Sequence, residues 1–299
     1  MKIVVIVVTY NGIRWIEKCL NSLRDSSLAT QVIVIDNASV DGTTFLLEKF
    51  YPEVELIKNS NNLGFGKANN IGLKKALDRE ADFVLLLNQD AWIGDGCIEK
   101  LIEILRAHPA IHLLSPFHYN YEGNGIEAYF NDFVLAQYTP GYEETKGKDM
   151  YESSFIHAAC WMLPAATLKV VGGFDPLFRH TGEDNDYVQR LHSKGMKVGF
   201  TPLAKMYHQG TNEGLINPEQ NYRLKLNTAL LKLKNPRATT AGAWALLGKS
   251  VFSTCKRMIG NGNIKGLKVE LSLLVEIVGA FYRIRRSRVQ QTGNTPFIK

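Results

Sequence analysis

The sequence predicts an α/β protein with a mostly parallel central sheet flanked by helices and a helical extension at the C-terminus. Three observations support this fold class. Short apolar runs rich in Val, Ile and Leu recur in the first ninety residues, helical patterns separate them, and the composition shifts after Asn235. Runs that are apolar on both faces suit central strands of a parallel sheet, and strand–helix alternation favours right-handed βαβ units.

The elements of the first half follow from hydrophobic periodicity. We predict helices near 15–23, 45–50, 68–75 and 97–105, because apolar side chains there recur at helical spacing. Residues 115–155 mix aromatic, glycine and acidic residues, and we expect irregular loops and edge strands there. The predicted strands are 3–8, 32–35, 54–57 and 83–87.

Composition and charge limit the class of protein. Hydrophobic residues make up 45% of the 299, so wholesale disorder is excluded. The four cysteines form no CxxC pair, and the apolar run after Met1 lacks a cleavage site, so we expect a reduced, cytoplasmic protein. Residues 232–299 contain 13 basic and two acidic side chains, whereas residues 1–231 contain 22 basic and 27 acidic ones.

The basic segment 236–299 is predicted to form amphipathic helices over 241–259 and 264–286. Its longest apolar stretch contains charges and is shorter than the roughly 20 residues that a membrane span needs. Arginines follow directly, a profile typical of a helix lying on an anionic membrane surface. Packing on the domain or on a second subunit of a homodimer explains the stripe equally well, and nucleic acid is the less favoured partner. The stripe consists of Leu267, Leu271, Leu274, Val275, Val278 and Phe281.

Polar residues follow each of the four predicted strands, where ligands of parallel α/β sheets bind. The four segments begin at Thr9, Asp36, Asn59 and Asn88. No GxGxxG follows the first strand and no GxxxxGK[ST] occurs, so dinucleotide and P-loop sites are not indicated.

Five motifs in order resemble family 2 glycosyltransferases of the GT-A fold, especially the bacterial rhamnosyltransferase-like branch. They are VTYNG at 8–12, VIDNASVDGT at 34–43, NLGFGKANNIG at 62–72, LLLNQDA at 85–91 and GGFDPLFRHTGEDNDYVQR at 172–190. The resemblance covers about residues 1–230. It implies a glycosyltransferase domain over 1–235, with a nucleotide-binding half at 1–110 and an acceptor-binding half at 111–235.

The resemblance implies that a nucleotide-diphospho-sugar and a divalent cation bind at the strand ends. Asp90 occupies the acidic position of a DxD-type motif and is expected to hold Mg²⁺ or Mn²⁺, together with His208. Asn88 replaces the first acid, so we assign it a ribose or positioning contact. The alternative role for Asp90 is that of a helix N-cap. Asp41 is a candidate nucleotide contact, and its alternative role is that of a turn or helix cap. The donor-binding residues are expected to be Thr9, Tyr10, Asn11, Asp36, Asn37, Asn69, Asn88 and Asp90.

The acceptor hydroxyl needs a general base, and the run from Glu183 to Asp186 offers three carboxylates. In the family the acid after the Glu of this motif is the base, which carries over to Asp184. We expect Glu183 to orient the acceptor and Asp186 to contact it or to brace the cluster with Arg190. Trp161 is expected either to stack on an acceptor sugar or to fill the core.

The expected reaction is a single displacement with inversion at the anomeric carbon. The donor is expected to be dTDP-rhamnose or a UDP-sugar, and the acceptor a glycan or lipid-linked glycan, with the enzyme peripheral on the inner face of a membrane. A sugar nucleotidyltransferase is one alternative, although the segment from Thr9 to Gly12 lacks the basic residue that a triphosphate loop requires. A non-catalytic protein that binds nucleotide-sugars is the other.

Overall fold

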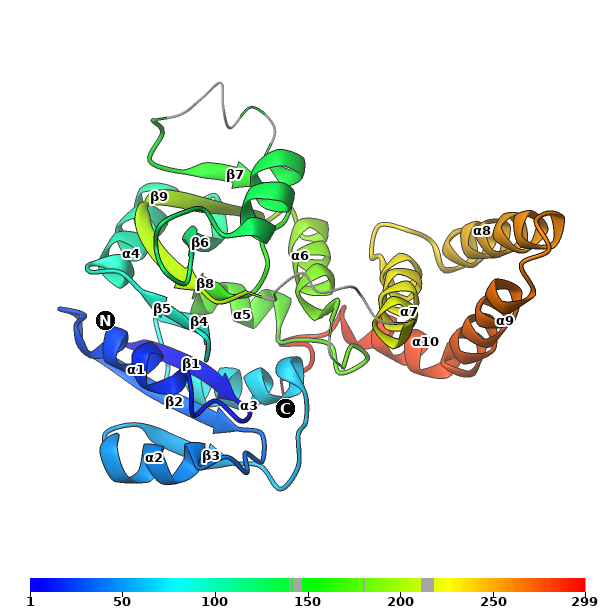
Figure 1. Ribbon diagram of the computed structural model, residues 1–299. Coiled ribbons are helices and arrows are strands. Elements are labelled where there is room, and N and C mark those ends of the chain that lie inside the picture. The colour runs from blue at the N-terminus through cyan, green and yellow to red at the C-terminus, as the bar shows by residue number, and fades with distance from the viewer. Residues whose placement is uncertain (140, 142–146, 180, 211–217, 299) are drawn as a thin grey trace.

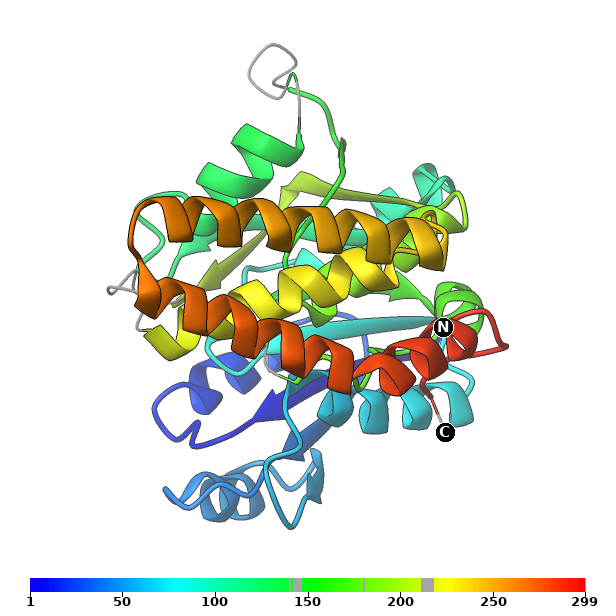
Figure 2. The same cartoon turned by 90° about the vertical axis from the view of Figure 1, so that its right-hand side faces the viewer.

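The computed structural model describes residues 1–299 except 140, 142–146, 180, 211–217 and 299 (Figure 1). The described strands form one sheet with the order β3-β2-β1-β4-β8-β6-β9-β5, and β7 pairs with β9. Helices cover both faces of this sheet, and four further helices, α7 to α10, lie together beside it (Figures 1 and 2).

The first half is the parallel part of the sheet, and all four predicted strands are confirmed. Their bounds are β1 Ile3–Thr9, β2 Thr30–Asp36, β3 Glu55–Lys58 and β4 Phe83–Asn88. They pair in parallel in the order β3-β2-β1-β4. The intervening helices are α1 Ile16–Arg24, α2 Thr43–Phe50 and α3 Phe65–Asp78. Val5 packs with α1 and α2 on one face of the sheet, and Ile6 packs with α3 on the other.

The second half of the sheet is mixed, so the expectation of a mostly parallel sheet holds only for the first half. β4 with β8, β6 with β8, β5 with β9 and β7 with β9 are antiparallel, and only β6 with β9 is parallel. The second-half strands are β5 Ala91–Ile93, β6 Ile111–Asn120, β7 Tyr151–Ser153, β8 Cys160–Pro164 and β9 Lys197–His208. Although only Gln89 and Asp90 separate β4 from β5, these two strands do not pair, because β5 pairs with β9 at the other end of the strand order.

The helices of the second half complete the two layers. They are α4 Cys97–Ala107, α5 Ala165–Val171, α6 Glu183–Ser193 and a π-helix, η1, over Phe130–Tyr138. The prediction of irregular structure over 115–155 was therefore incomplete. β6 extends to Asn120, and η1 buries Phe130 and Val134 against Phe200.

The C-terminal helices have an apolar core of their own. Their bounds are α7 Pro218–Lys234, α8 Thr240–Gly260, α9 Ile264–Gly279 and α10 Phe281–Gln290. Leu233, Leu247 and Ile277 meet in this core, together with Phe178 from the sheet domain. Among the described helices, none combines the length and apolarity that a membrane crossing requires.

Helix α9 carries two apolar faces instead of one. The face that packs contains Leu273 and Ile277, which are 5% and 0% exposed. The predicted stripe lies largely on the other side, because Leu271, Val275 and Val278 are 48%, 72% and 55% exposed. Packing within this chain therefore does not account for the outer part of the stripe.

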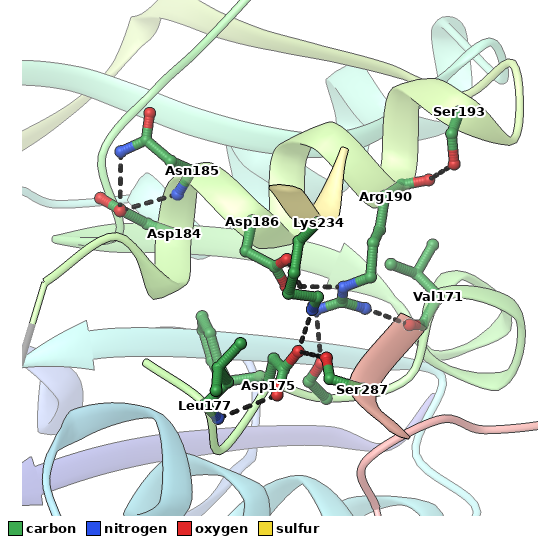
Figure 3. Close-up of polar contacts among 12 residues, drawn as sticks. Val171, Asp175, Leu177, Asp184, Asn185, Asp186, Arg190, Ser193, Lys234 and Ser287 are labelled. Carbon is green, nitrogen blue, oxygen red and sulfur yellow. Dashed lines mark hydrogen bonds and ion pairs between the residues drawn. The ribbon is translucent and has the colours of Figure 1, made fainter. Parts of the chain in front are cut away.

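A buried ionic cluster ties α7 and α10 to α6 (Figure 3). The Lys234 ammonium, fully buried, donates to Asp186 at 2.8 Å and to Asp175. Arg190 donates to the other oxygen of Asp186 at 2.8 Å, and Ser287 of α10 donates to Asp175. Two cations and two carboxylates thus pair in a dry setting, where loss of one partner leaves an uncompensated charge.

We expect Lys234→Met to lower the free energy of unfolding by about 3–5 kcal/mol, because Asp175 would lose its buried cation and Asp186 would keep only Arg190. Urea titration followed by circular dichroism measures this change. The matched control is Lys232→Met on the exposed side of α7, which should change the free energy by less than about 0.5 kcal/mol. Equal stability of the two variants would show that the cluster does not hold the helices together.

Candidate functional site

Gln89 ties together the carboxyl ends of β1 and β4. Its Oε1 accepts hydrogen bonds from Thr9 Oγ1 at 2.6 Å and from the Tyr10 N–H at 3.0 Å. A Cβ at Gly12 would lie 2.3 Å from the same Oε1, so a larger residue there would displace the Gln89 amide from these hydrogen bonds. Thr9 is fully buried and Tyr10 is 46% exposed, so Tyr10 is the one whose ring is free to border a ligand.

Asp36 lies beside Thr9 in the sheet register and is 2% exposed. Its carboxylate accepts from the Ser39 N–H at 3.1 Å, which leaves further acceptor capacity at the strand edge. Asn11 has a left-handed φ of 49°, a conformation that asparagine tolerates, and its Oδ1 accepts from the Val40 N–H at 2.9 Å. These contacts join the loops that follow β1 and β2 into one rim.

The structure does not support the predicted donor contacts of Asn37 and Asn69. Asn37 Oδ1 accepts from Asn59 Nδ2 at 2.9 Å and from the Leu63 N–H at 3.4 Å, so the loop uses its acceptor capacity. Asn69 is 1% exposed within α3 and donates to the Phe65 carbonyl at 3.0 Å. Asp41 accepts from the Thr43 N–H and the Ile13 N–H at 3.0 Å each, which confirms its turn-and-cap role.

Asp90 and His208 come together as predicted. β5 pairs with the end of β9, where Ala91 lies opposite His208. His208 Nε2 is 3.5 Å from Asp90 Oδ1 and 3.4 Å from Asn88 Nδ2. The N-cap role for Asp90 is wrong, because α4 begins only at Cys97, after Gly96.

Glu127, His157 and His118, which were not predicted as site residues, extend this group. Glu127 Oε1 lies 3.9 Å from His208 Nδ1, and Glu127 Oε2 lies 3.6 Å from His157 Nε2. His118 Nδ1 lies 3.2 Å from His157 Nε2. Burial lowers the pKa of His157 to about 3 and holds that of His118 well below its usual value, so both rings are neutral. These three residues lie in separate parts of the chain and form no motif, so no sequence signal marks them as a group.

Glu183 and Asp184 open α6, directly after Gly182, whose φ is 89°. Burial first, and then the neighbouring Asp184 carboxylate, raise the pKa of Glu183 to about 7. Burial also raises the pKa of Asp184. The Asp184 carboxylate accepts from the Asn185 N–H at 2.7 Å, and the backbone of Ala158 is close enough to lower its pKa.

Residues 158–159 connect the acidic pair to the strand-end group. The Asn88 N–H donates to the Ala159 carbonyl at 3.0 Å. Ala159 directly follows Ala158, whose backbone lies beside the Asp184 carboxylate. His157 precedes them, and its ring centroid is 6.0 Å from that of His208. Asp184, Asn88 and His208 therefore border one region at the carboxyl edge of the sheet.

Trp161 and Asp186 do not face an acceptor. Trp161 is fully buried in β8, with its ring centroid 5.6 Å from that of Tyr187 and 6.1 Å from that of Phe174. Its core role is thus correct and sugar stacking is wrong. Asp186 is 1% exposed and paired with Arg190 and Lys234, so it braces α6, and the predicted acceptor contact is wrong.

Known proteins resemble this chain in sequence and in fold. An N-acetylglucosaminyl-diphospho-decaprenol L-rhamnosyltransferase of Mycobacterium tuberculosis is 26% identical over 68% of this chain and 75% of its own length. A dTDP-rhamnosyl transferase of Shigella flexneri is 25% identical over 77% of this chain and 79% of its own.

Two solved structures share the fold. TarS 1–349 of S. aureus in complex with UDP has a TM-score of 0.55 and 20% identity, covering 81% of this chain and 68% of its own. A mannosyltransferase of Pyrobaculum calidifontis, in complex with GDP-Man and Mn²⁺, has a TM-score of 0.59 and 18% identity, covering 93% and 75%. The family model "Glycosyl transferase family 2" matches residues 4–172. With this match over more than half of its length, the chain belongs to glycosyl transferase family 2 and is a glycosyltransferase with the GT-A fold.

Proposed function

We propose that this enzyme transfers a sugar from a nucleotide-diphospho-sugar to a glycan or lipid-linked glycan, with inversion and with Asp184 as the general base. The observation that carries the proposal is the backbone connection through Ala158 and Ala159, which joins Asp184 to Asn88. The two rhamnosyltransferase relatives make dTDP-rhamnose the first donor to test and UDP-sugars the second. The same relatives speak against the nucleotidyltransferase and non-catalytic alternatives.

Asp90 and His208 are the proposed ligands of a Mg²⁺ or Mn²⁺ ion. A carboxylate oxygen and an imidazole nitrogen 3.5 Å apart fit two neighbouring positions around one cation, and the imidazole favours Mn²⁺. When bound, the cation neutralises the diphosphate as it leaves. Asn88 lies beside this pair, with Nδ2 at 3.4 Å from His208 Nε2, and keeps its proposed ribose or positioning contact.

In this proposal Asp184 takes the proton of the acceptor hydroxyl. That oxygen attacks the anomeric carbon while the bond to the diphosphate oxygen breaks, and the nucleoside diphosphate leaves with the electron pair. One displacement inverts the anomeric configuration and requires no covalent enzyme intermediate. The Asn185 N–H fixes the carboxylate, and burial makes it a stronger base than an exposed aspartate. Glu183, half-protonated near pH 7, is suited to hold an acceptor hydroxyl.

The exposed face of the C-terminal helices supports a membrane-borne acceptor. Phe252 of α8, Val275 of α9 and Tyr282 of α10 are 72%, 72% and 78% exposed. Arg283, Arg285 and Arg286 follow Tyr282 in the sequence of α10. Exposed apolar side chains together with a run of arginines suit anionic lipid headgroups at the inner face of a membrane. Burial of this face in a homodimer is the competing arrangement.

We expect Asp184→Asn to reduce kcat by a factor of about 10²–10⁴, since the general base is lost while the shape of the side chain is kept. Donor affinity, measured by isothermal titration with the nucleotide, should stay near that of the unmodified enzyme. Asp78→Asn, at the exposed end of α3, is the matched control and should leave kcat unchanged. Retained turnover, or loss of donor binding, would refute the role of Asp184.

Removal of the cation should abolish transfer. EDTA treatment is expected to reduce turnover of dTDP- or UDP-sugars to background, and Mn²⁺ or Mg²⁺ should restore it. Asp90→Asn should raise the Mn²⁺ concentration needed for half-maximal activity by at least about tenfold, because one carboxylate ligand is lost. An enzyme indifferent to EDTA would exclude the metal-dependent mechanism.

Substitution of the exposed face should weaken membrane binding without unfolding the protein. We expect Val275→Ser with Tyr282→Ser to lower co-sedimentation with phosphatidylglycerol vesicles several-fold, since both side chains lie outside the helical core. Val170→Ser, at an exposed apolar position of α5, is the control. Unchanged sedimentation, combined with a dimer-to-monomer shift in analytical ultracentrifugation, would assign the face to a homodimer instead.

A further inference from the structure

Three metal-ligating side chains meet beside the donor region without belonging to the proposed donor-cation pair. They are His118 near the end of β6, Glu127 ahead of η1 and His157 ahead of β8. One nitrogen or oxygen of each lies within 4.8 Å of the others. All three are largely shielded from solvent; the side chains of Glu127 and His157 are 8% and 13% exposed.

The hydrogen bonds around His118 determine which ring nitrogen is free. Ser115 Oγ lies 2.8 Å from the Cys160 carbonyl oxygen and 2.7 Å from His118 Nε2. A carbonyl oxygen cannot donate, so the hydroxyl hydrogen points at Cys160, and Ser115 Oγ accepts from the Nε2–H of His118. His118 Nδ1 therefore presents a lone pair toward His157. A ring held in one tautomer by a partner on its far nitrogen is the arrangement typical of metal-ligating histidines.

The spacing of the donor atoms matches the coordination sphere of a small cation. A tetrahedral Zn²⁺ with bonds of about 2.0–2.1 Å places its ligand atoms roughly 3.3–3.4 Å apart. His118 Nδ1 and His157 Nε2 are 3.2 Å apart, and His157 Nε2 and Glu127 Oε2 are 3.6 Å apart. The third pair, His118 and Glu127, lies within 4.8 Å, so these two side chains approach one another when all three bind one ion.

The surroundings of the cluster hold its ligands in place. Glu127 Oε2 accepts from the Phe130 N–H at 2.8 Å at the start of η1. The ring of Phe130 stacks on His118 with centroids 4.5 Å apart, and the ring of Tyr129 meets His157 edge-on at 4.8 Å. Such a polar group enclosed by aromatic rings favours a borderline transition metal over Mg²⁺, which prefers oxygen ligands and keeps its waters.

We propose that His118, Glu127 and His157 form a Zn²⁺-type metal site, separate from the donor cation at Asp90, with two imidazoles, one carboxylate and one open position. The ion would fix His157 and with it the next two residues. The backbone of Ala158 lies beside the Asp184 carboxylate and the Ala159 carbonyl accepts from the Asn88 N–H, so the bound ion would order the segment that borders both residues. Glu127, 3.9 Å from His208 Nδ1, links the two metal sites.

The competing arrangement is a simple hydrogen bond from His157 Nε2–H to His118 Nδ1, which the same 3.2 Å distance allows. The two arrangements differ in the number of Zn²⁺ ions bound per chain and in whether neutralising Glu127 weakens Zn²⁺ binding. A hydrogen-bonded pair needs no Zn²⁺, whereas a metal site loses one of its ligands when Glu127 becomes neutral.

The test uses the full chain carrying Asp90→Asn, so that the proposed donor site is weakened. The protein is stripped with a chelator and titrated with ZnCl₂, and with CoCl₂ as a spectroscopic probe of coordination geometry. We expect one equivalent of Zn²⁺ and visible Co²⁺ absorption of a four-coordinate site. Adding Glu127→Gln or His157→Ala should weaken Zn²⁺ binding at least about tenfold. His112→Ala, in the strand β6 that also carries His118, should not weaken it.

Glu127→Gln keeps the acceptor for the Phe130 N–H, so it separates ligand loss from unfolding, which circular dichroism checks. The proposal is overturned if the Asp90→Asn protein binds no stoichiometric Zn²⁺, or if binding survives both Glu127→Gln and His157→Ala. The readout is metal binding, so failure of the transfer assays would leave the result intact.

Discussion

Two consecutive residues, Ala158 and Ala159, bring the two sides of the site together. The backbone of Ala158 lies beside the Asp184 carboxylate, and the Ala159 carbonyl accepts from the Asn88 N–H. This is possible because β8 runs antiparallel to β4, with Cys160 opposite Leu87, so the residues before β8 lie at the carboxyl end of β4. A parallel β8 would put these residues at the opposite edge of the sheet. The mixed half of the sheet is therefore what brings the second half of the chain to the nucleotide edge.

Much of the fold could be predicted from the sequence, because its signals are local. Each of the four apolar runs indicates a strand from its own residues alone. The carboxyl ends of parallel strands lie at the same edge of the sheet, so the polar residues that follow the runs lie there together. Asp90 and His208 meet as the family resemblance implies. The antiparallel half could not be predicted in this way, since pairing between β8 and β4 depends on contacts between residues distant in sequence.

The misassigned side chains show the same limit. Asp186 follows Asp184 by two residues, and only Lys234, 48 residues further on, turns it into a buried brace. Trp161 lies in a segment that suits a sugar or a core equally well, and packing against Tyr187 decides between them. Glu127 and His157 lack any periodic context, so only the folded chain reveals that they face one another.

The two apolar faces of α9 have a consequence for how the C-terminal region can be studied. Leu273 and Ile277 cover Leu233 and Leu247, while Val275 lies on the outside. A chain truncated before α9 would lose the outer face and at the same time uncover the inner core of α7 and α8. Truncation would thus remove one exposed apolar surface and create another. A gain in solubility requires substitution of outward-facing residues in the intact chain.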